Sequence, residues 1–367
     1  MKYESKILIC LLVFCMVLGA FASCASEKDT DTLENTSDPA AEKESVESTS
    51  PVKQSKTIDI YLIAGQSNAA GSTYISDRSS AYAFASELEK GFSNILFSGQ
   101  ASDSDRYYWR KTTLGLGRGK DGSYMGPEAG MAKALSAYYN PETGNTAGFI
   151  KVAYGGTSLL NVTDGQNALY KGNWVPPSYA SDKGLYYGDS AITGGLYRNL
   201  LAIFKQQLQM LSYNGFESFN IKGLYWMQGE NDRDNPQEYK KAFQFLVQDL
   251  RRDLSNIVRE MTDGDDRGAS EMPIFVGTIS KTFDSATQYS VETNSNFINM
   301  QKLLPNLPNV GDIIIVDNSD YAINKMEGPN SVAIGSDQYH WNQSDHLAIG
   351  DNVGKAILAY YHYNNGR

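Results

Sequence analysis

Four short blocks of the sequence contain residue types that could together carry out acyl transfer. The first block, Gly65, Gln66, Ser67 and Asn68, directly follows a short apolar, β-branched run that suits a strand buried on both faces. Ligands of open α/β sheets bind at the carboxyl ends of the strands, so this serine lies where chemistry usually happens. A serine in this place could instead cap the next helix, and the first block alone leaves both roles open.

The other three blocks lie after predicted strands or before the last predicted helix. Gly155 and Gly156 are paired glycines that allow backbone N–H groups to face a ligand. Gln228 follows another apolar run and offers an amide donor, and Asp337 precedes His340 by three residues. Together with the serine, these residues would supply a nucleophile, a base, an orienting carboxylate and oxyanion donors.

In this order, the four blocks resemble those of the SGNH hydrolases, in the branch of sialate O-acetylesterase-like carbohydrate esterases. That branch carries the motifs Gly-Gln-Ser-Asn, Gly-Gly-Thr-Ser, Trp-x-Gln-Gly-Glu-x-Asp and Asp-x-x-His. The sequence matches them at residues 65–68, 155–158, 226–232 and 337–340. The resemblance spans nearly all of residues 57–367 and implies an enzyme that removes O-acetyl groups from carbohydrate.

The resemblance also implies catalytic roles for three residues. Ser67 would attack the acetyl carbonyl, and His340 would take its proton and pass it to the leaving sugar oxygen. Asp337 would fix the tautomer of the imidazole, and water would then release acetate.

The oxyanion would be held by the backbone N–H groups of Ser67 and of Gly155 or Gly156, together with the amide of Gln228. Gln228 has a second possible role as a turn residue that bonds local backbone. Three further residues of the blocks would support the site, and one of them, Glu230, could act on the histidine or be a purely structural carboxylate. The supporting residues are Gln66, Asn68 and Glu230.

The remaining histidines are predicted to lie on the surface. No Asp stands three residues before His346, and His362 is near the end of the chain. The sequence contains neither a paired-histidine motif nor a cysteine cluster, so we expect no metal site and no cofactor.

Residues 1–24 have the pattern of an export signal. Lys2 and Lys6 precede an apolar stretch that is too short to span a membrane comfortably. Small residues then lead to Cys24 in a sequence that resembles the lipobox of bacterial lipoproteins, in which the cysteine is lipidated. An ordinary secretory peptide cleaved near Ala22 is the alternative. We expect a lipoprotein of the bacterial cell surface or periplasm, attached to the membrane only through Cys24, or otherwise a secreted protein.

The rest of the chain divides into a tether and one domain. Residues 25–56 are rich in Ser, Thr, Glu, Asp and Lys and are predicted to be a disordered tether. Residues 57–367 would form the esterase domain. The net charge of −10 argues against nucleic acid as a partner. Acetylated carbohydrate is the partner that the resemblance implies.

Apolar runs alternate with helical patterns along this domain. The alternation predicts a three-layer α/β/α sandwich with a roughly five-stranded parallel sheet. The resemblance implies that this sandwich is of the SGNH, flavodoxin-like type. We interpret residues 72–126 and 160–194 as long substrate-binding loops, with surface decoration as the alternative. The predicted strands are residues 58–64, 147–154, 221–227, 273–279 and 312–317. The predicted helices are residues 127–139, 195–213, 237–261, 297–304 and 344–362.

The leading hypothesis for function is an exported O-acetylesterase acting on sialic acid or on acetylated plant polysaccharide such as xylan. A second is an esterase for peptidoglycan O-acetyl groups or other short-chain esters. A third, from a different class, is a carbohydrate-binding lipoprotein without turnover. The presence of Ser67, Asp337 and His340 argues against the third.

Overall fold

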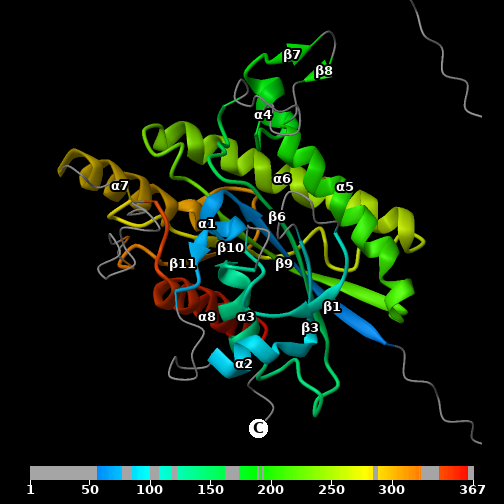
Figure 1. Cartoon of the computed structure of the whole chain (residues 1–367). Helices are drawn as coiled ribbons and strands as arrows, with labels where there is room; N and C mark the ends of the chain where they lie inside the picture. The colour runs from blue at the N-terminus through cyan, green and yellow to red at the C-terminus, as the bar shows by residue number, and fades with distance from the viewer. Residues whose placement is uncertain are drawn as a thin grey trace, which may run out of the picture. The chain divides into compact units, whose positions relative to one another are not determined.

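The domain is described for most of its length. The computed structural model describes residues 56–76, 85–99, 107–117, 122–161, 173–187, 190–191, 194–283, 288–321, 323 and 339–362 (Figure 1). The predicted signal segment with Cys24, the tether up to residue 55, and Asp337 lie outside the described residues. Within the described ranges, none of the helices combines the length and the apolar character that crossing a bilayer requires.

A seven-stranded sheet forms the middle layer, in the order β11-β10-β9-β1-β6-β3-β4. All neighbours in it pair in parallel except β4, which is antiparallel to β3 at one edge. β1 lies in the middle because its apolar residues can be buried on both faces. The strands are β1 (Thr57–Gly65), β3 (Phe92–Gly99), β4 (Arg110–Thr112), β6 (Ala147–Ala153), β9 (Ser218–Met227), β10 (Ile274–Gly277) and β11 (Ile313–Val316).

Helices cover both faces of the sheet, which confirms the predicted α/β/α layering (Figure 1). Alternate side chains of a strand point to opposite faces, and β1 therefore contributes to two cores. Ile60 and Leu62 belong to the core on the side of α5 and α6. Tyr61 and Ile63 belong to the core on the side of α3 and α8. The four helices are α3 (Pro127–Leu135), α5 (Gly195–Met210), α6 (Pro236–Met261) and α8 (Gln343–Tyr360).

Local chemistry sets where these helices begin. Pro127 and Pro236 occupy the first position of α3 and α6, where the missing N–H costs nothing. Asn342 caps α8, because its side-chain oxygen accepts a hydrogen bond of 2.9 Å from the N–H of Asp345. The cap fixes the point at which the chain enters α8, two residues after His340.

The five predicted strands are confirmed, but the sheet has two more, β3 and β4, in a segment that we expected to be a loop. β3 was missed because polar Ser93 and Asn94 interrupt its apolar residues. Asn94 is accommodated because its amide donates to the carbonyls of Asn140 and Asn145.

The two long segments that we interpreted as loops contain further short elements, and α7 begins at Gln288 rather than at residue 297. The remaining elements are α1 (Ser67–Ala70), β2 (Thr73–Tyr74), α2 (Ala85–Lys90), β5 (Tyr124–Met125), α4 (Pro177–Asp182), β7 (Tyr186–Tyr187), β8 (Ser190–Ala191), η1 (Ser212–Asn214), α7 (Gln288–Gln301) and η2 (Leu304–Asn306).

Candidate active site

A sharp turn between β1 and the single-turn helix α1 presents Ser67. Gly65 has φ 141°, and a Cβ there would come within 1.9 Å of the carbonyl oxygen of Met227, so only glycine fits. The N–H of Gln66 donates to that same carbonyl at 3.0 Å, which fixes the turn against β9. Ser67 then takes the first helical position, where the backbone N–H has no partner within the helix.

Asn68 connects the serine block with the histidine block. Its amide nitrogen donates to Oε1 of Glu230 at 2.8 Å and to the carbonyl oxygen of Tyr339 at 3.3 Å. Asn68 follows Ser67, and Tyr339 precedes His340. These two hydrogen bonds therefore bring the serine, Glu230 and the histidine together at the carboxyl edge of the sheet.

Glu230 is a buried carboxylate next to the histidine. Burial raises the pKa of Glu230, whereas the hydrogen bond from Asn68 and the charges of His340 and Arg233 lower it. Its second oxygen, Oε2, is buried and has no hydrogen-bond partner among the described residues. A carboxylate oxygen in this state can accept a bond from an imidazole N–H.

Asp232 ties the loop after β9 to the glycine loop after β6. Its Oδ2 accepts bonds from Gln228 at 2.6 Å and from the N–H of Leu159 at 2.8 Å, and its Oδ1 accepts from the hydroxyl of Ser158. Burial raises the pKa of Asp232, and these donors partly oppose that shift. Asp232 is the last residue of the third block, and its motif alone predicted no role for it.

The glycine loop begins beside the serine turn. The N–H of Tyr154 donates to the carbonyl oxygen of Gly65 at 3.2 Å, and exposed Gly155 and Gly156 follow. Gly156 has φ 70°, a conformation that glycine adopts at little cost, and its carbonyl accepts a bond from Asn231. The loop thus places exposed backbone next to the serine turn, on the β6 side of β1.

Gln228 is fully buried, and its amide nitrogen is used inside the protein. Besides Asp232, it donates to the carbonyl of Thr157 at 3.2 Å and to Oε1 of Gln66 at 3.3 Å. Gln228 thereby holds the serine turn, the glycine loop and the β9 loop to one another. Only the bond to Asp232 is local, so these contacts differ from the turn role considered from the sequence, and a direct oxyanion role of Gln228 stays a prediction.

We expect Gln228→Ala to lower the free energy of unfolding by about 1–3 kcal/mol, because it leaves buried acceptors without their donor. Urea denaturation and steady-state kinetics on one preparation measure stability and kcat together. A variant as stable as the wild type but slower by about 10²–10³-fold in kcat would instead make the amide a direct oxyanion donor.

His346 is fully buried, so its predicted surface position is wrong. It lies on the same face of α8 as Ile349 and Val353, and its Nδ1 is 2.6 Å from the hydroxyl of Thr73. Burial lowers its pKa to about 3, so it stays neutral at physiological pH. Its environment is that of a packed core residue. His362 is exposed, as predicted.

A buried ion pair behind α1 was also missed by the sequence analysis. Nζ of Lys151 donates to the carbonyl oxygens of Ala70 at 3.0 Å and Leu116 at 2.9 Å, and to Oε2 of Glu128 at 3.1 Å. Burial lowers the pKa of Lys151, and the charge of Glu128 opposes that shift. Since Ala70 ends α1, the pair fixes the helix that carries Ser67. A lysine within the apolar run of β6 was the signal for it.

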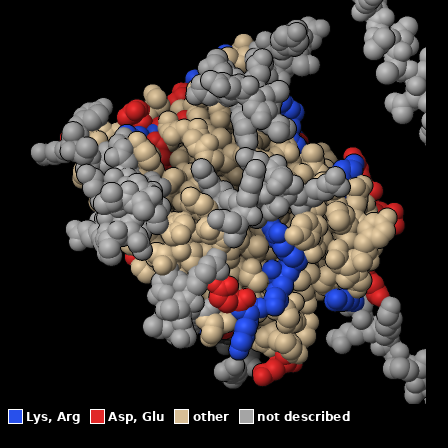
Figure 2. Space-filling view, in the orientation of Figure 1, with Lys and Arg blue, Asp and Glu red and all other residues tan. Residues whose placement is uncertain are grey.

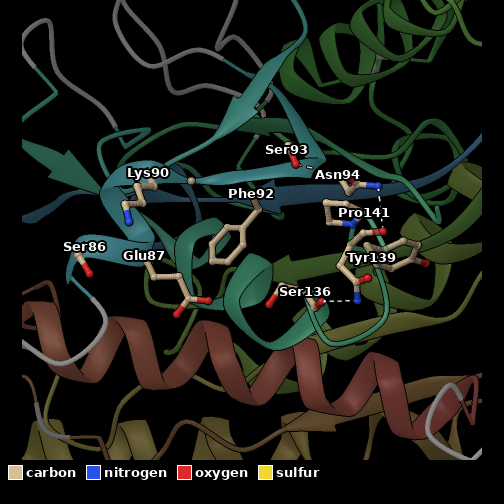
Figure 3. A pocket seen from close by; sticks show the side chains of 11 residues that line it. Ser86, Glu87, Lys90, Phe92, Ser93, Asn94, Ser136, Tyr139 and Pro141 are labelled. Carbon is tan, nitrogen blue, oxygen red and sulfur yellow. Dashed lines mark hydrogen bonds between the residues drawn. The ribbon is translucent and has the colours of Figure 1, made fainter. Parts of the chain in front are cut away.

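A polar pocket of about 320 Å³ lies at the amino ends of the parallel strands, where β3 begins (Figure 3). Two of its hydroxyl groups are bonded within the protein: that of Ser93 donates to Asn94, and that of Ser136 to the carbonyl of Lys133. Because β1, β6 and β3 run parallel, Ser67 lies at their carboxyl ends, and this pocket is separate from the candidate site.

On the side seen in Figure 2, several Lys and Arg side chains of the described residues form a narrow strip, and other basic side chains are scattered. Among the described residues, no group of three or more His, Cys, Asp or Glu side chains is placed to hold a metal ion.

A serine after a parallel strand, in a block whose Asn68 bonds to a buried carboxylate and to the residue before a histidine, fits a serine hydrolase. A family model described as carbohydrate esterase, sialic acid-specific acetylesterase, matches residues 57–359, and the chain belongs to that family. The protein is thus a carboxylic ester hydrolase of the carbohydrate acetylesterase type. No curated protein sequence matches the chain.

Solved structures similar to the chain include a protein from Arabidopsis thaliana, at 16% identity and TM-score 0.43, covering 82% of this chain and 98% of that one. A carbohydrate acetylesterase from Xanthomonas citri shares 16% identity at TM-score 0.46, over 84% of this chain and 57% of that one. A carbohydrate acetylesterase from Sinorhizobium meliloti shares 10% identity at TM-score 0.39, over 83% of this chain and 99% of that one.

Proposed function

We propose that the protein removes O-acetyl groups from carbohydrate through an acetyl-enzyme intermediate on Ser67. Oγ of Ser67 attacks the acetyl carbonyl while His340 takes its proton. The sugar oxygen then leaves with that proton, and a water molecule, deprotonated by the same histidine, releases acetate and restores the serine. The observation that carries the proposal is the pair of Asn68 hydrogen bonds, which tie the serine block to Glu230 and to the residue before His340.

The developing negative charge on the carbonyl oxygen needs nearby donors. We assign this role to the backbone N–H groups of Ser67 and of Gly155 or Gly156. The first lies at the amino end of α1 and the others in the adjacent loop after β6. Gln228 and Asp232 act on this oxyanion site by holding the two loops in place.

Acetate release from a panel of substrates tests the function. The panel contains O-acetylated xylo-oligosaccharides, O-acetylated sialic acid, O-acetylated peptidoglycan fragments and p-nitrophenyl acetate. We expect turnover of acetylated sugars, and an organophosphonate inhibitor should add to the peptide that contains Ser67. Glycan binding without acetate release from any substrate would make the protein a binding protein instead.

Two carboxylates can orient the imidazole: Asp337, three residues before His340, and Glu230, whose buried Oε2 has no partner among the described residues. We expect Glu230→Gln to lower kcat by about 10²-fold or more, since an amide cannot stabilise the imidazolium as a carboxylate does. Comparison with Asp337→Asn identifies the larger contributor. A Glu230→Gln variant with wild-type kcat and reduced stability would assign Glu230 a structural role only.

We also propose that the enzyme acts outside the cytoplasm, as a lipoprotein attached through Cys24. The basic start, the short apolar stretch and the lipobox-like ending of residues 1–24 support this. Membrane fractionation of cells that express the full chain and the Cys24→Ala variant tests it. Equal membrane association of both proteins would contradict the anchor.

A further inference from the structure

The direction in which the substrate leaves the site follows from the proposed reaction, on which this inference rests. The carbonyl oxygen of the acetyl group must point to the backbone donors near Ser67 and in the loop after β6. The leaving sugar oxygen must lie against His340, which returns the proton to it. The sugar ring is therefore placed on the side of the histidine, away from the glycine loop.

The residue directly before the histidine carries an exposed aromatic ring. Tyr339 directly precedes His340, and its side chain is 43% exposed. Its backbone is fixed in the site, because its carbonyl oxygen accepts the bond from Asn68. The ring packs against that of Phe283, with centroids 5.5 Å apart and an angle of 51° between the planes.

Phe283 gives this ring a rigid support. It lies in the segment that follows β10, on the other side of β9 from β1. It is buried, and its carbonyl oxygen accepts a bond of 2.7 Å from Asn294. The guanidinium of Arg233 lies over the Phe283 ring, 4.9 Å from its centroid. Tyr339 therefore presents a partly exposed aromatic face on a packed base.

We propose that Tyr339 is a specificity-determining residue whose ring stacks against the pyranose that carries the acetyl group. A pyranose face is lined with C–H groups, which pack favourably on an aromatic ring, and an amphipathic tyrosine suits a site that is apolar yet open to water. The substrate class is therefore a pyranoside ester rather than a short alkyl ester.

The other exposed aromatic side chains of the described residues lie elsewhere. Tyr108 stacks with Arg110 of β4, at the edge of the sheet. Tyr213 is in η1, before β9 begins, and is 89% exposed. Tyr213 is therefore a suitable control, because it has the same side chain at a place far from the carboxyl ends of the strands.

The test measures kcat/KM for a mono-O-acetylated xylotriose and for ethyl acetate, which has no ring. We expect Tyr339→Ala to lower the ratio of the two values, sugar ester over ethyl acetate, by about five- to tenfold, mainly through KM. Tyr339→Phe should keep the wild-type ratio because it keeps the ring, and Tyr213→Ala should keep it because it is remote.

The outcomes separate this inference from the function on which it rests. If the wild type hydrolyses neither ethyl acetate nor any acetylated sugar of the panel above, the proposed function fails. If the wild type hydrolyses both, and Tyr339→Ala slows both by the same factor, the esterase stands but the stacking role is wrong. The same conclusion follows if Tyr339→Phe loses as much of the ratio as Tyr339→Ala, because the hydroxyl would then be the important group.

Discussion

Ser67→Ala should leave the protein folded and lower kcat for acetyl esters by about 10⁴-fold or more. Ser67 is only 8% exposed, but it sits at the first position of α1, where alanine fits the helical backbone. The substitution removes the oxygen to which the acetyl group would be transferred, while the backbone donors remain. Circular dichroism and a melting curve verify the fold, and acetate release measures the loss.

A second substitution shows whether the serine acts together with the histidine. His340→Asn should reduce kcat by a similar factor, and the double variant should be no slower than either single one, because residues of one catalytic unit are not additive. The His346→Asn variant is the control for a buried histidine outside the mechanism, and its loss should appear in stability. Near wild-type turnover of Ser67→Ala would remove this serine from the reaction.

Lys151→Met should lower the free energy of unfolding by about 3–5 kcal/mol, because it leaves the carboxylate of Glu128 buried without its partner. Lys151 and Glu128 are 2% and 0% exposed, so water cannot replace the missing charge. The carbonyl groups of Ala70 and Leu116 also lose a donor. Urea denaturation measures the change in stability.

Two further variants separate charge from packing. The double variant Lys151→Met with Glu128→Gln should regain much of the lost stability, since no unpaired charge is left inside. Lys133 pairs with Glu87, and their side chains are 29% and 42% exposed, respectively. Lys133→Met should therefore lower the free energy of unfolding by no more than about 1 kcal/mol. If Lys151→Met were as mild as Lys133→Met, the buried pair would not hold α1.

The local sequence predicted strands whose residues are apolar throughout. It did not predict a strand whose polar residues depend on hydrogen-bond partners far away in the sequence. β1 was predicted because its apolar residues are consecutive. β3 was missed because Asn94 can lie in a strand only when the carbonyls of Asn140 and Asn145, some 50 residues later, receive its amide. Spacing to neighbouring residues gives no sign of such a partner.

In the candidate site, too, residues with a local sequence signal were predicted, and residues that depend on tertiary contacts were missed. The blocks around Ser67 and Gly155 were found from their motifs, because glycines and a serine after a strand are local signals. The burial of His346 was missed because it depends on α8 packing against the β1–α1 side of the sheet. The contacts of Asp232 were missed because they join loops from two different strands.

The position of Asn68 has a consequence for how the chain folds. The bond from Asn68 to the carbonyl of Tyr339 joins residues 271 positions apart, and β1 cannot pair fully until β9 has been synthesised. Contacts between such distant segments are slow to form, because closing a long loop costs entropy before the contact repays it. During refolding, esterase activity should therefore return after the helical circular dichroism signal. Catalytic competence would be the last property that the chain acquires.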